Sequence, residues 1–381
     1  MSNRMARMDF GLFSVVLLML GFGIVIVYSS SFALAQWRFG GSDFFLARQT
    51  VRALLALASF MFFINVDYHI WGKLGNVIYL FAVILLIAVL VHPASQAING
   101  ARRWISIGPV NFQVSELARM ALIMVLARNC EKAGPEIKNW NVLMRCLILT
   151  GIVCGLILIE PNYSTALLLG ITAMSMLFLS GANILHLGGV MVSMIPLAIL
   201  LVLKTPYRMA RIQGFMKMSS EQANLSYQAT QSIIGLGNGG LFGVGIGKGE
   251  QKFFYLPEPH TDFAISIIGE EIGFVGLMIV LAMFVFIIYR GMRISLLAPD
   301  KLGQMMAFGF TFVVAVYTLI HIFVGTAMMP TTGIPLPFLS YGGMSLVFMM
   351  SSMGILLNIS SQARYGLAVQ KNRRFTGLAE V

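Results

Sequence analysis

The sequence predicts an all-α membrane protein that crosses the bilayer many times. Of its 381 residues, 58% are hydrophobic and only 11% are charged, whereas a soluble protein has about a quarter of its residues charged. Apolar stretches recur along the chain at the length of roughly 20 residues that a helix needs to cross a membrane. The net charge of +11 does not indicate nucleic-acid binding, because the basic residues lie in short segments between the apolar stretches and form no basic face.

Ten apolar stretches are predicted to be transmembrane helices. They fall at about 11–35, 46–66, 74–91, 113–129, 143–160, 165–181, 186–203, 263–289, 304–329 and 340–361. The first is longer than the apolar region of a signal peptide, so we expect it to be retained. An even number of helices places both termini on one side of the membrane. We therefore predict a single membrane domain over residues 1–381, with one large loop at about 204–262 between helices 7 and 8.

The distribution of basic residues predicts the orientation. With both termini in the cytoplasm, fourteen of the 26 basic residues lie in cytoplasmic segments. The short outer loops then hold five, which are Arg38, Arg48, Arg52, Arg102 and Arg103. This bias follows the positive-inside rule and makes the large loop extracytoplasmic. The three cysteines lack the spacing of a disulfide framework or a zinc site.

A basic motif lies on an outer loop before the fourth predicted helix. Arg102, Arg103 and Trp104 occur consecutively, and arginine side chains suit the phosphate oxygens of a lipid head group. The alternative is an interfacial anchor of aromatic and arginine side chains. Glu116 and Arg119 follow at the start of the helix, on one face, where they can form an ion pair with either a structural or a functional role.

Glu160 precedes Pro161 in a short turn between two predicted helices. A carboxylate at this position either closes the turn or belongs to a site, and we favour the first interpretation.

The large loop carries further polar candidates. Arg208 and Arg211 share a helical face that suits pyrophosphate or anionic lipid, or is simply a solvated basic face. Gln228 and Ser232 lie on a second amphipathic stretch, Tyr227–Leu236. The glycine-rich run that follows does not match a phosphate-binding P-loop. We expect its glycines to permit tight turns and close backbone approach, leaving Lys248 as an exposed cation.

The acidic cluster that ends the large loop has three open interpretations. Glu258, His260 and Asp262 lie within five residues, beside two prolines that prevent a helix. Asp262 is either the N-cap of the next helix or a general base kept ionised by the helix dipole. The three side chains are also a weak candidate set for a divalent cation; the sequence otherwise indicates no cofactor. Farther along, Glu270 and Glu271 are intramembrane acids and hence candidate site residues.

A second non-helical segment precedes the last predicted helix. Three prolines and three glycines between Met329 and Ser345 predict an irregular hairpin. Irregular backbone at membrane depth occurs only where protein or a water-filled cavity covers it. We therefore expect this segment to line the same site as Asp262.

Taken together, these motifs resemble the SEDS proteins of bacteria, which are ten-helix peptidoglycan polymerases of the FtsW and RodA type. The similarity rests on Gly-Ala-Arg-Arg-Trp, Ser-Glu-Leu-Ala-Arg, Leu-Pro-Glu-Pro-His-Thr-Asp-Phe, Gly-Glu-Glu-Ile-Gly and Gly-Ile-Pro-Leu-Pro-Phe-Leu-Ser-Tyr-Gly-Gly, in this order. The segments Pro206–Arg211 and Gly245–Tyr255 look more like the division (FtsW) branch. Three positions depart from the family pattern, namely Arg119 for lysine, Asn162 for aspartate and Met344 for serine.

The resemblance implies an inverting glycosyltransferase that polymerises lipid II at the outer face of the bacterial cytoplasmic membrane. Asp262 matches the essential aspartate of the family. The predicted substrate-binding residues are Arg102, Arg103, Trp104, Glu116, Arg119, Arg208, Arg211, Gln228, Ser232, Lys248, Glu258, His260, Thr261, Pro337, Ser340 and Tyr341. The resemblance also implies a class B penicillin-binding protein, divisome proteins and membrane lipids as partners, with enrichment at the division septum.

Two other functions are compatible with the sequence. A lipid II flippase or related transporter would also show intramembrane charges and broken helices. A scaffold that only recruits a partner would tolerate removal of the Asp262 charge. A polymerase, in contrast, requires its base on an outward loop beside the membrane surface.

Overall fold

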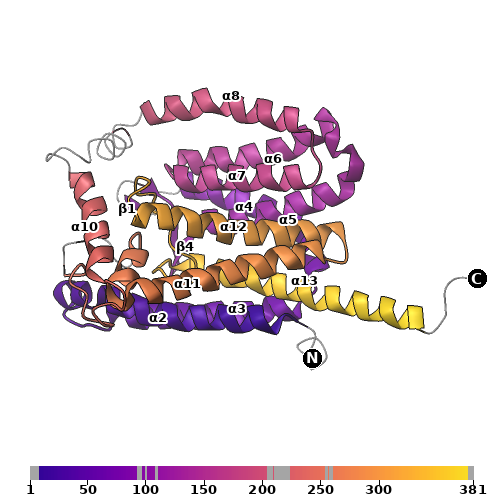
Figure 1. The fold of residues 1–381 in the computed structure, drawn as a ribbon. Coiled ribbons are helices and arrows are strands. Elements are labelled where there is room, and N and C mark those ends of the chain that lie inside the picture. The colour runs from indigo at the N-terminus through magenta and orange to yellow at the C-terminus, as the bar shows by residue number, and fades with distance from the viewer. Residues whose placement is uncertain are drawn as a thin grey trace, which may run out of the picture.

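The computed structural model describes residues 8–91, 97–98, 101–107, 110–203, 209, 224–253, 256 and 261–375. This part of the chain is mostly helical (Figure 1). Its long helices are α2 (Phe10–Phe39), α3 (Phe44–Asn65), α4 (Tyr68–Val91), α5 (Val114–Ala133), α6 (Trp140–Ile159), α7 (Tyr163–Leu179), α8 (Ile184–Leu203), α10 (Asn224–Asn238), α11 (Ala264–Leu296), α12 (Lys301–Gly325) and α13 (Met344–Phe375). A short 3-10 helix, Gly134–Lys138, follows α5.

Eight of the described helices are long and apolar enough to cross a membrane. They are α2, α3, α4, α6, α7, α11, α12 and α13. Two other helices occupy predicted spans: α5, which carries five charged residues, and α8, which is apolar over Ile184–Pro196. The structure thus supports a helical membrane protein, and the number of ten crossings stays a prediction.

Four short strands depart from the predicted all-α fold. β1 (Ala97–Ile98) pairs with β2 (Ala101–Arg102), and β3 (Trp104–Ile107) pairs with β4 (Val110–Gln113), each in an antiparallel hairpin. The second hairpin is rich in tryptophan, isoleucine, valine and phenylalanine, which favour extended backbone. The sequence predicted an outer loop in this segment without strands, so the two hairpins are an addition to the predicted all-α fold.

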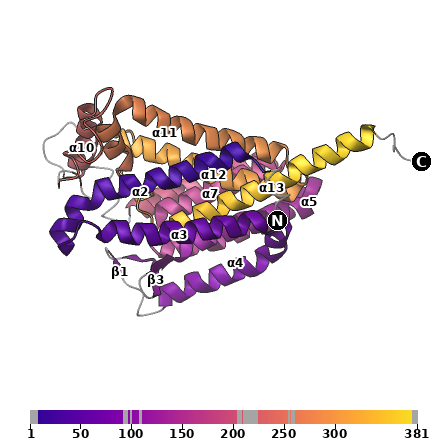
Figure 2. The same ribbon diagram turned by 90° about the horizontal axis from the view of Figure 1, so that it is seen from below.

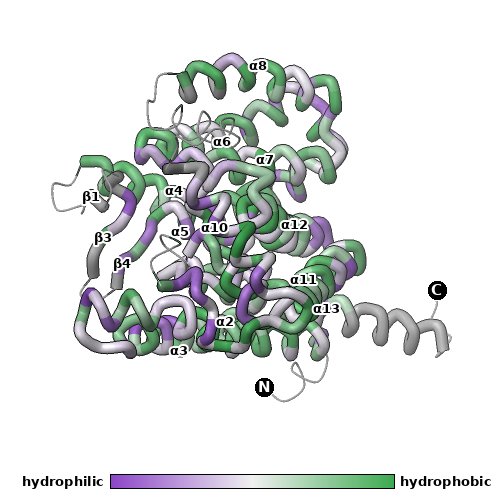
Figure 3. Tube along the Cα trace, turned by 60° about the vertical axis from the view of Figure 1, so that its left-hand side comes forward, coloured by the Kyte–Doolittle hydropathy of each residue, from purple (hydrophilic) through white to green (hydrophobic). Residues whose placement is uncertain are grey.

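The helices form a bundle with two distinct ends (Figures 1 and 2). Both ends of the described chain lie at one of them, which we call the terminal end, whereas α10 and the two hairpins lie at the other, the loop end. Most of the α5 side chains are buried, and so are those of α12 and the first part of α13, so these helices form the centre. Figure 3 shows that the helices of the bundle are mainly apolar.

Aspartate side chains begin two of the helices at the terminal end. Asp9 accepts a hydrogen bond from the Leu12 N–H at 3.0 Å and starts α2. Asp300 accepts one from the Gly303 N–H at 2.6 Å and starts α12. Each carboxylate satisfies an N–H group that has no partner inside its helix.

The helix α11 is broken near the loop end. Its 33 residues would extend about 50 Å as a regular helix, well beyond the roughly 30 Å of a bilayer core. Gly273 adopts non-helical angles, φ 71° and ψ −175°. The carbonyls of the two glutamates before the break accept hydrogen bonds from Val244 and Gly245, both at 3.0 Å. After the break, two N–H groups donate to Gly240 and Leu241, at 2.9 and 3.1 Å.

The backbone of the glycine-rich run therefore fills the break in α11. Close approach explains the glycines, as expected from the sequence: a Cβ atom at Gly239 would lie 2.0 Å from the Gly269 carbonyl oxygen. No side chain fits at such a distance.

Candidate functional site

Asp262 lies at the loop end, on the turn that leads directly into α11. Its side chain is half-buried. The N-cap residue of α11 is Phe263, and that N-cap makes no side-chain hydrogen bond. The interpretation of Asp262 as the N-cap residue is therefore wrong, because the helix begins one residue later than expected.

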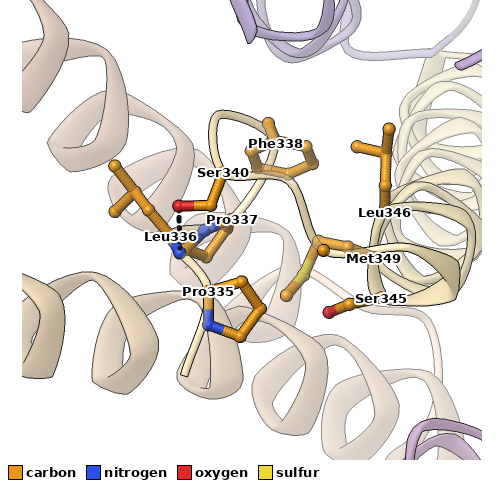
Figure 4. A pocket seen from close by; sticks show the side chains of 9 residues that line it. Pro335, Leu336, Pro337, Phe338, Ser340, Ser345, Leu346 and Met349 are labelled. Atoms are coloured by element: carbon orange, nitrogen blue, oxygen red, sulfur yellow. Dashed lines mark hydrogen bonds between the residues drawn. The ribbon is translucent and has the colours of Figure 1, made fainter. Parts of the chain in front are cut away.

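Two separate segments hold the backbone of this turn at Thr261. The Ser340 hydroxyl donates to the Thr261 carbonyl oxygen at 2.8 Å, and the His321 Nε2 lies 3.3 Å from the same oxygen. Ser340 also accepts a hydrogen bond from the Leu336 N–H at 2.9 Å (Figure 4). The segment between α12 and α13 thus contacts the turn that carries Asp262, as the sequence led us to expect.

That segment forms a small pocket of its own (Figure 4). The pocket is lined by Pro335, Leu336, Pro337, Phe338, Ser340, Gly342, Ser345, Leu346 and Met349. It includes the predicted site residues Pro337 and Ser340, which are buried. Tyr341 is half-buried beside them and packs edge-on against Phe45 of α3, with ring centroids 5.3 Å apart.

Glu116 and Arg119 form a buried ion pair at the start of α5. The Arg119 Nη2 lies 2.6 Å from the Glu116 Oε2, and both side chains are 4% exposed. The Arg119 Nη1 also donates to the Tyr317 hydroxyl at 2.7 Å, and the guanidinium lies 5.0 Å from the centre of that ring. The pair predicted from the spacing of three residues is present.

One face of α12 connects this ion pair to the turn of Asp262. Tyr317 and His321 are four residues apart, hence neighbours on the helix surface, and both are buried. Tyr317 contacts Arg119, while His321 contacts the Thr261 carbonyl. Sequence reasoning missed both residues, although a histidine inside an apolar span is a signal for a functional or structural polar site.

The two glutamates of α11 have structural partners. Glu271 forms an ion pair with Lys252 at 2.6 Å, with both side chains fully buried, and accepts a hydrogen bond from the Ser29 hydroxyl of α2 at 2.6 Å. Glu270 accepts hydrogen bonds from the backbone N–H groups of Glu250 and Gln251, at 2.8 and 3.3 Å. These acids therefore hold the segment after the glycine-rich run against the broken helix. Lys252 was also missed in the sequence.

Arg103 connects the hairpins to the turn between α6 and α7. Its Nε donates to the Glu160 carbonyl oxygen at 3.1 Å, and its Nη2 donates to the Pro161 carbonyl oxygen at 2.7 Å. Trp104 is half-buried in β3. The guanidinium of Arg103 therefore stabilises this turn. From the sequence we had expected Glu160 to have that role.

The Glu160 carboxyl group is fully buried, and neither of its oxygens has a hydrogen-bond partner in the part of the chain that the structure describes. Burial raises the pKa of this group to about 8, and the charge of Arg103 opposes the increase only in part. The nearby Asn162 is also buried, and its Nδ2 has no partner within the described residues.

Other predicted residues lie apart or outside the described part. Ser232 is fully buried, donates to the Gly325 carbonyl at 2.6 Å and contacts the Ser266 hydroxyl, so it joins three helices and leaves no surface for a ligand. Gln228 is half-buried on α10, and Lys248 is exposed, as expected. The Arg102 side chain and the residues Arg208, Arg211, Glu258 and His260 lie outside the described residues.

No group of three or more histidine, cysteine, aspartate or glutamate side chains that could hold a metal ion occurs among the described residues. The candidate cation ligands from the sequence were Glu258, His260 and Asp262. Because Glu258 and His260 lie outside the described residues, this cation site stays a prediction.

Comparison with known proteins places this geometry in a family. Residues 10–365 match the FtsW/RodA/SpoVE family, described as cell cycle protein. The chain belongs to this family. The match covers nearly all of the sequence, including both motifs that meet at Thr261 and the helix that carries Glu116 and Arg119.

Individual relatives in the FtsW/RodA/SpoVE family are similar over most of their length. A protein of Geobacter sp. (strain M18), named probable peptidoglycan glycosyltransferase FtsW, is 38% identical over 344 residues, which are 90% of this chain and 94% of the relative. Stage V sporulation protein E of Bacillus subtilis (strain 168) is 38% identical over 370 residues, covering 96% of this chain and all of the relative.

Solved structures share the fold. The chain matches a structure described as "Structural coordination of polymerization and crosslinking by a peptidoglycan synthase complex" with a TM-score of 0.74 and 26% identity, over 94% of this chain and 98% of the other. The crystal structure of rod shape determining protein RodA from Thermus thermophilus gives a TM-score of 0.70 and 28% identity, with the same coverage.

Proposed function

We propose that this protein is a peptidoglycan glycosyltransferase that polymerises lipid II into glycan strands at the outer face of the bacterial cytoplasmic membrane. Family membership and two relatives at 38% and 37% identity that are named probable peptidoglycan glycosyltransferase support this activity. The relatives named FtsW favour a role in septal wall synthesis during division.

The proposed topology has ten membrane-spanning helices and both termini in the cytoplasm. Eight described helices are suited to crossing, and α5 and α8 lie at the two remaining predicted spans. The positive-inside bias orients the bundle, so that the terminal end faces the cytoplasm and the loop end faces outward. Asp262 then lies on the side where a cell-wall polymer is assembled.

The proposed reaction uses Asp262 as the general base. Its carboxylate accepts the proton of the 4-hydroxyl of the N-acetylglucosamine in the acceptor. That oxygen forms a bond to the anomeric carbon of N-acetylmuramic acid in the donor, with inversion. The bond from this carbon to the phosphate oxygen breaks, and its electron pair leaves with undecaprenyl pyrophosphate.

The observation that carries this proposal is the position of Asp262. It lies on a turn whose preceding residue, Thr261, is contacted by Ser340 and His321. A base must be held within hydrogen-bond reach of the proton that it removes, and a turn with its backbone fixed from two sides provides that position. The buried pair of Glu116 and Arg119, connected through α12, is the second charged group of the proposed site.

The transporter alternative relied partly on intramembrane charges, Glu270 and Glu271 among them. Glu271 is paired with Lys252, and Glu270 accepts backbone hydrogen bonds. Neither glutamate is an unpaired carboxylate of the kind that an alternating-access carrier uses to bind a coupling ion. These contacts favour the polymerase.

By the same family relationship, we propose a class B penicillin-binding protein as the crosslinking partner, together with divisome proteins and membrane lipids. The structurally similar complex described above combines polymerisation with crosslinking, which supports a partner of that type.

The test is polymerisation of lipid II by purified protein in detergent, alone and with its cognate transpeptidase. Detergent removes the second compartment, so that product formation cannot come from transport. Asp262→Ala and Asp262→Asn should lower the rate by about a hundredfold or more, the usual contribution of a positioned base. The matched control is Asp43→Asn, because Asp43 is exposed on the turn before α3 and makes no side-chain cap hydrogen bond.

Two results would contradict the proposal. A wild-type protein that forms no polymer, with or without the transpeptidase, is not a polymerase. An active wild type whose Asp262 variants retain their rate has a different base.

A further inference from the structure

The inner face of α3 carries two buried polar side chains, Gln49 and Arg52. They are three residues apart and therefore neighbours on the helix surface. Gln49 is 1% exposed and Arg52 is 7% exposed. The orientation count placed Arg48 and Arg52 in an outer loop, and this was wrong: both lie within α3, in agreement with the predicted span at 46–66, and Arg52 is buried.

Both side chains have unused hydrogen-bonding capacity. The Nε2 and Oε1 of Gln49 and the Nη1 of Arg52 are buried and have no hydrogen-bond partner within the described part of the chain. Among the described residues, no carboxylate forms an ion pair with Arg52. Such groups are rare in folded proteins, because each loses its contacts with water and gains nothing in return.

The contact that Arg52 does make is with an aromatic ring. Its guanidinium carbon lies 4.5 Å from the centre of the Tyr341 ring. A cation–π contact offsets only part of the cost of burying a charge. It also leaves the N–H groups at the edge of the guanidinium plane for another ligand.

The location connects this pair to the proposed site. Tyr341 directly follows Ser340, whose hydroxyl donates to the Thr261 carbonyl beside Asp262. Arg52 therefore lies against the same segment that holds the turn of Asp262, and Gln49 is its neighbour on the surface of α3. Arg52 is about two helical turns from the start of α3 at the loop end.

We propose that Gln49 and Arg52 form a subsite for the pyrophosphate oxygens of a polyprenyl-pyrophosphate lipid, the substrate or product of the proposed polymerase. This inference rests on the proposed function. A guanidinium binds phosphate oxygens through parallel N–H groups, and the glutamine amide adds a further donor. An anionic ligand would supply both the missing charge partner and the missing acceptors.

The test measures binding without turnover, in the Asp262→Asn background, by the thermal shift of the purified protein. The probes are undecaprenyl pyrophosphate, undecaprenol and phosphatidylglycerol vesicles. Undecaprenyl pyrophosphate should stabilise the protein, whereas undecaprenol, which lacks phosphate, should not. Arg52→Gln should weaken the apparent affinity about tenfold or more, Arg52→Lys less, and Gln49→Leu about threefold.

The matched control is Arg38→Gln. Arg38 is also a cation beside an aromatic ring, 5.9 Å from the centre of Phe39, but it is exposed at the end of α2. Its removal should change the affinity by less than twofold. Gln49→Leu and Arg52→Lys keep the test informative if Arg52→Gln does not fold.

Three outcomes would overturn the subsite. Unchanged affinity for undecaprenyl pyrophosphate in the foldable variants shows that the two side chains do not bind it. Equal stabilisation by undecaprenol shows that the polyprenyl chain, not the phosphate, is recognised. Equal stabilisation by phosphatidylglycerol vesicles shows a general anionic-lipid site. Because binding is measured without catalysis, these results are independent of whether the wild type polymerises lipid II.

Discussion

The polar side chains at the two ends of the bundle differ in their hydrogen-bond and ion-pair partners. At the terminal end, carboxylates have partners from the chain itself. Asp9 pairs with Arg290 of α11 at 2.7 Å. Asp300 accepts a hydrogen bond from the Tyr68 hydroxyl at 2.7 Å and lies 2.7 Å from the Nε2 of His69. These contacts join the beginnings of α2, α4 and α12 to their neighbours.

At the loop end, several buried polar groups have no partner within the described residues. They are the side-chain atoms of Gln49, Arg52, Glu160 and Asn162. Other polar groups at this end do have partners. One network, which we call closed because its members contact one another, consists of Lys252, Glu271 and Ser29. The difference between the two ends concerns the carboxylates above all, because single nitrogen atoms of Trp71 and Arg290 at the terminal end also lack a partner within the described residues. For the paired groups we predict effects on stability. For the buried groups without a partner, which we call open groups, we predict effects on ligand binding or on the pH dependence of stability.

The largest effect on stability is expected at the closed network of the loop end. Lys252→Met leaves the Glu271 carboxylate buried without its cation, and the free energy of unfolding should fall by about 3–5 kcal/mol. The double variant Lys252→Met, Glu271→Leu removes both charges and should recover most of the loss. Thermal unfolding in detergent measures both, with the exposed Lys248→Met as the control. Equal losses in the single and double variants would show that packing, not charge, is responsible.

A smaller effect is expected where the glycine-rich run enters the break of α11. Gly239→Ala should lower the free energy of unfolding by about 3 kcal/mol, because its Cβ atom would lie 2.0 Å from a backbone oxygen that cannot move independently. The control is Gly237→Ala, where a Cβ atom meets nothing within 4 Å. The same thermal assay distinguishes them, and similar melting temperatures would contradict the close approach.

Glu160 should make stability depend on pH. Its ordinary pKa of 4.5 is raised to about 8 by burial, so the folded protein binds more protons than the unfolded chain between these values. The free energy of unfolding therefore falls as the pH rises through this window. Glu160→Gln cannot ionise and should be the more stable protein at pH 8, by on the order of 1–3 kcal/mol.

The control for this comparison is the exposed Glu136→Gln, in the 3-10 helix after α5. It should leave the pH profile of thermal unfolding unchanged. If wild type and Glu160→Gln have parallel profiles between pH 5 and pH 8, the carboxyl group is not protonated in the folded protein.

The smallest effect is expected at the terminal end. Asp300→Ala removes the N-cap of α12 together with the contacts to Tyr68 and His69. Because the aspartate is partly exposed, the loss should be about 1–2 kcal/mol. Lipid II polymerisation by the folded variant should remain within twofold of wild type, and a large loss of rate would mean that the two ends are coupled.

The sequence predicted the positions of the helices better than their interactions. Long apolar stretches identify membrane spans because backbone groups in lipid must be satisfied within a helix. The break in α11 was not predicted, because it depends on hydrogen bonds between the backbone of Gly240–Gly245 and the backbone on both sides of Gly273. The hairpins were missed for a similar reason: their strands are short, and their alternation was hidden between two apolar helices.

Local motifs predicted Asp262, Ser340, Glu116 and Arg119 as candidate site residues, and the structure shows the contact of Ser340 beside Asp262 and the ion pair of Glu116 with Arg119. Tyr317, His321 and Lys252 were missed, because a single polar residue in an apolar stretch shows neither its partner nor the direction of its side chain. Arg52 illustrates the same limit. Its charge suggested an outer loop, yet it lies on the buried face of a helix, over the ring of Tyr341.

The sequence by itself determined that this is a helical membrane protein of a recognisable family, with Asp262 next to the start of a long apolar helix. These properties follow from composition and from contiguous motifs. Apart from Glu116 and Arg119, whose spacing predicted their ion pair, only the tertiary structure decided which charges are paired, because most of the other contacts depend on distances between residues that are far apart in the chain. The sequence therefore could not show which buried side chains at the loop end lack a partner, because this depends on how α3, α12 and the segment before α13 pack together.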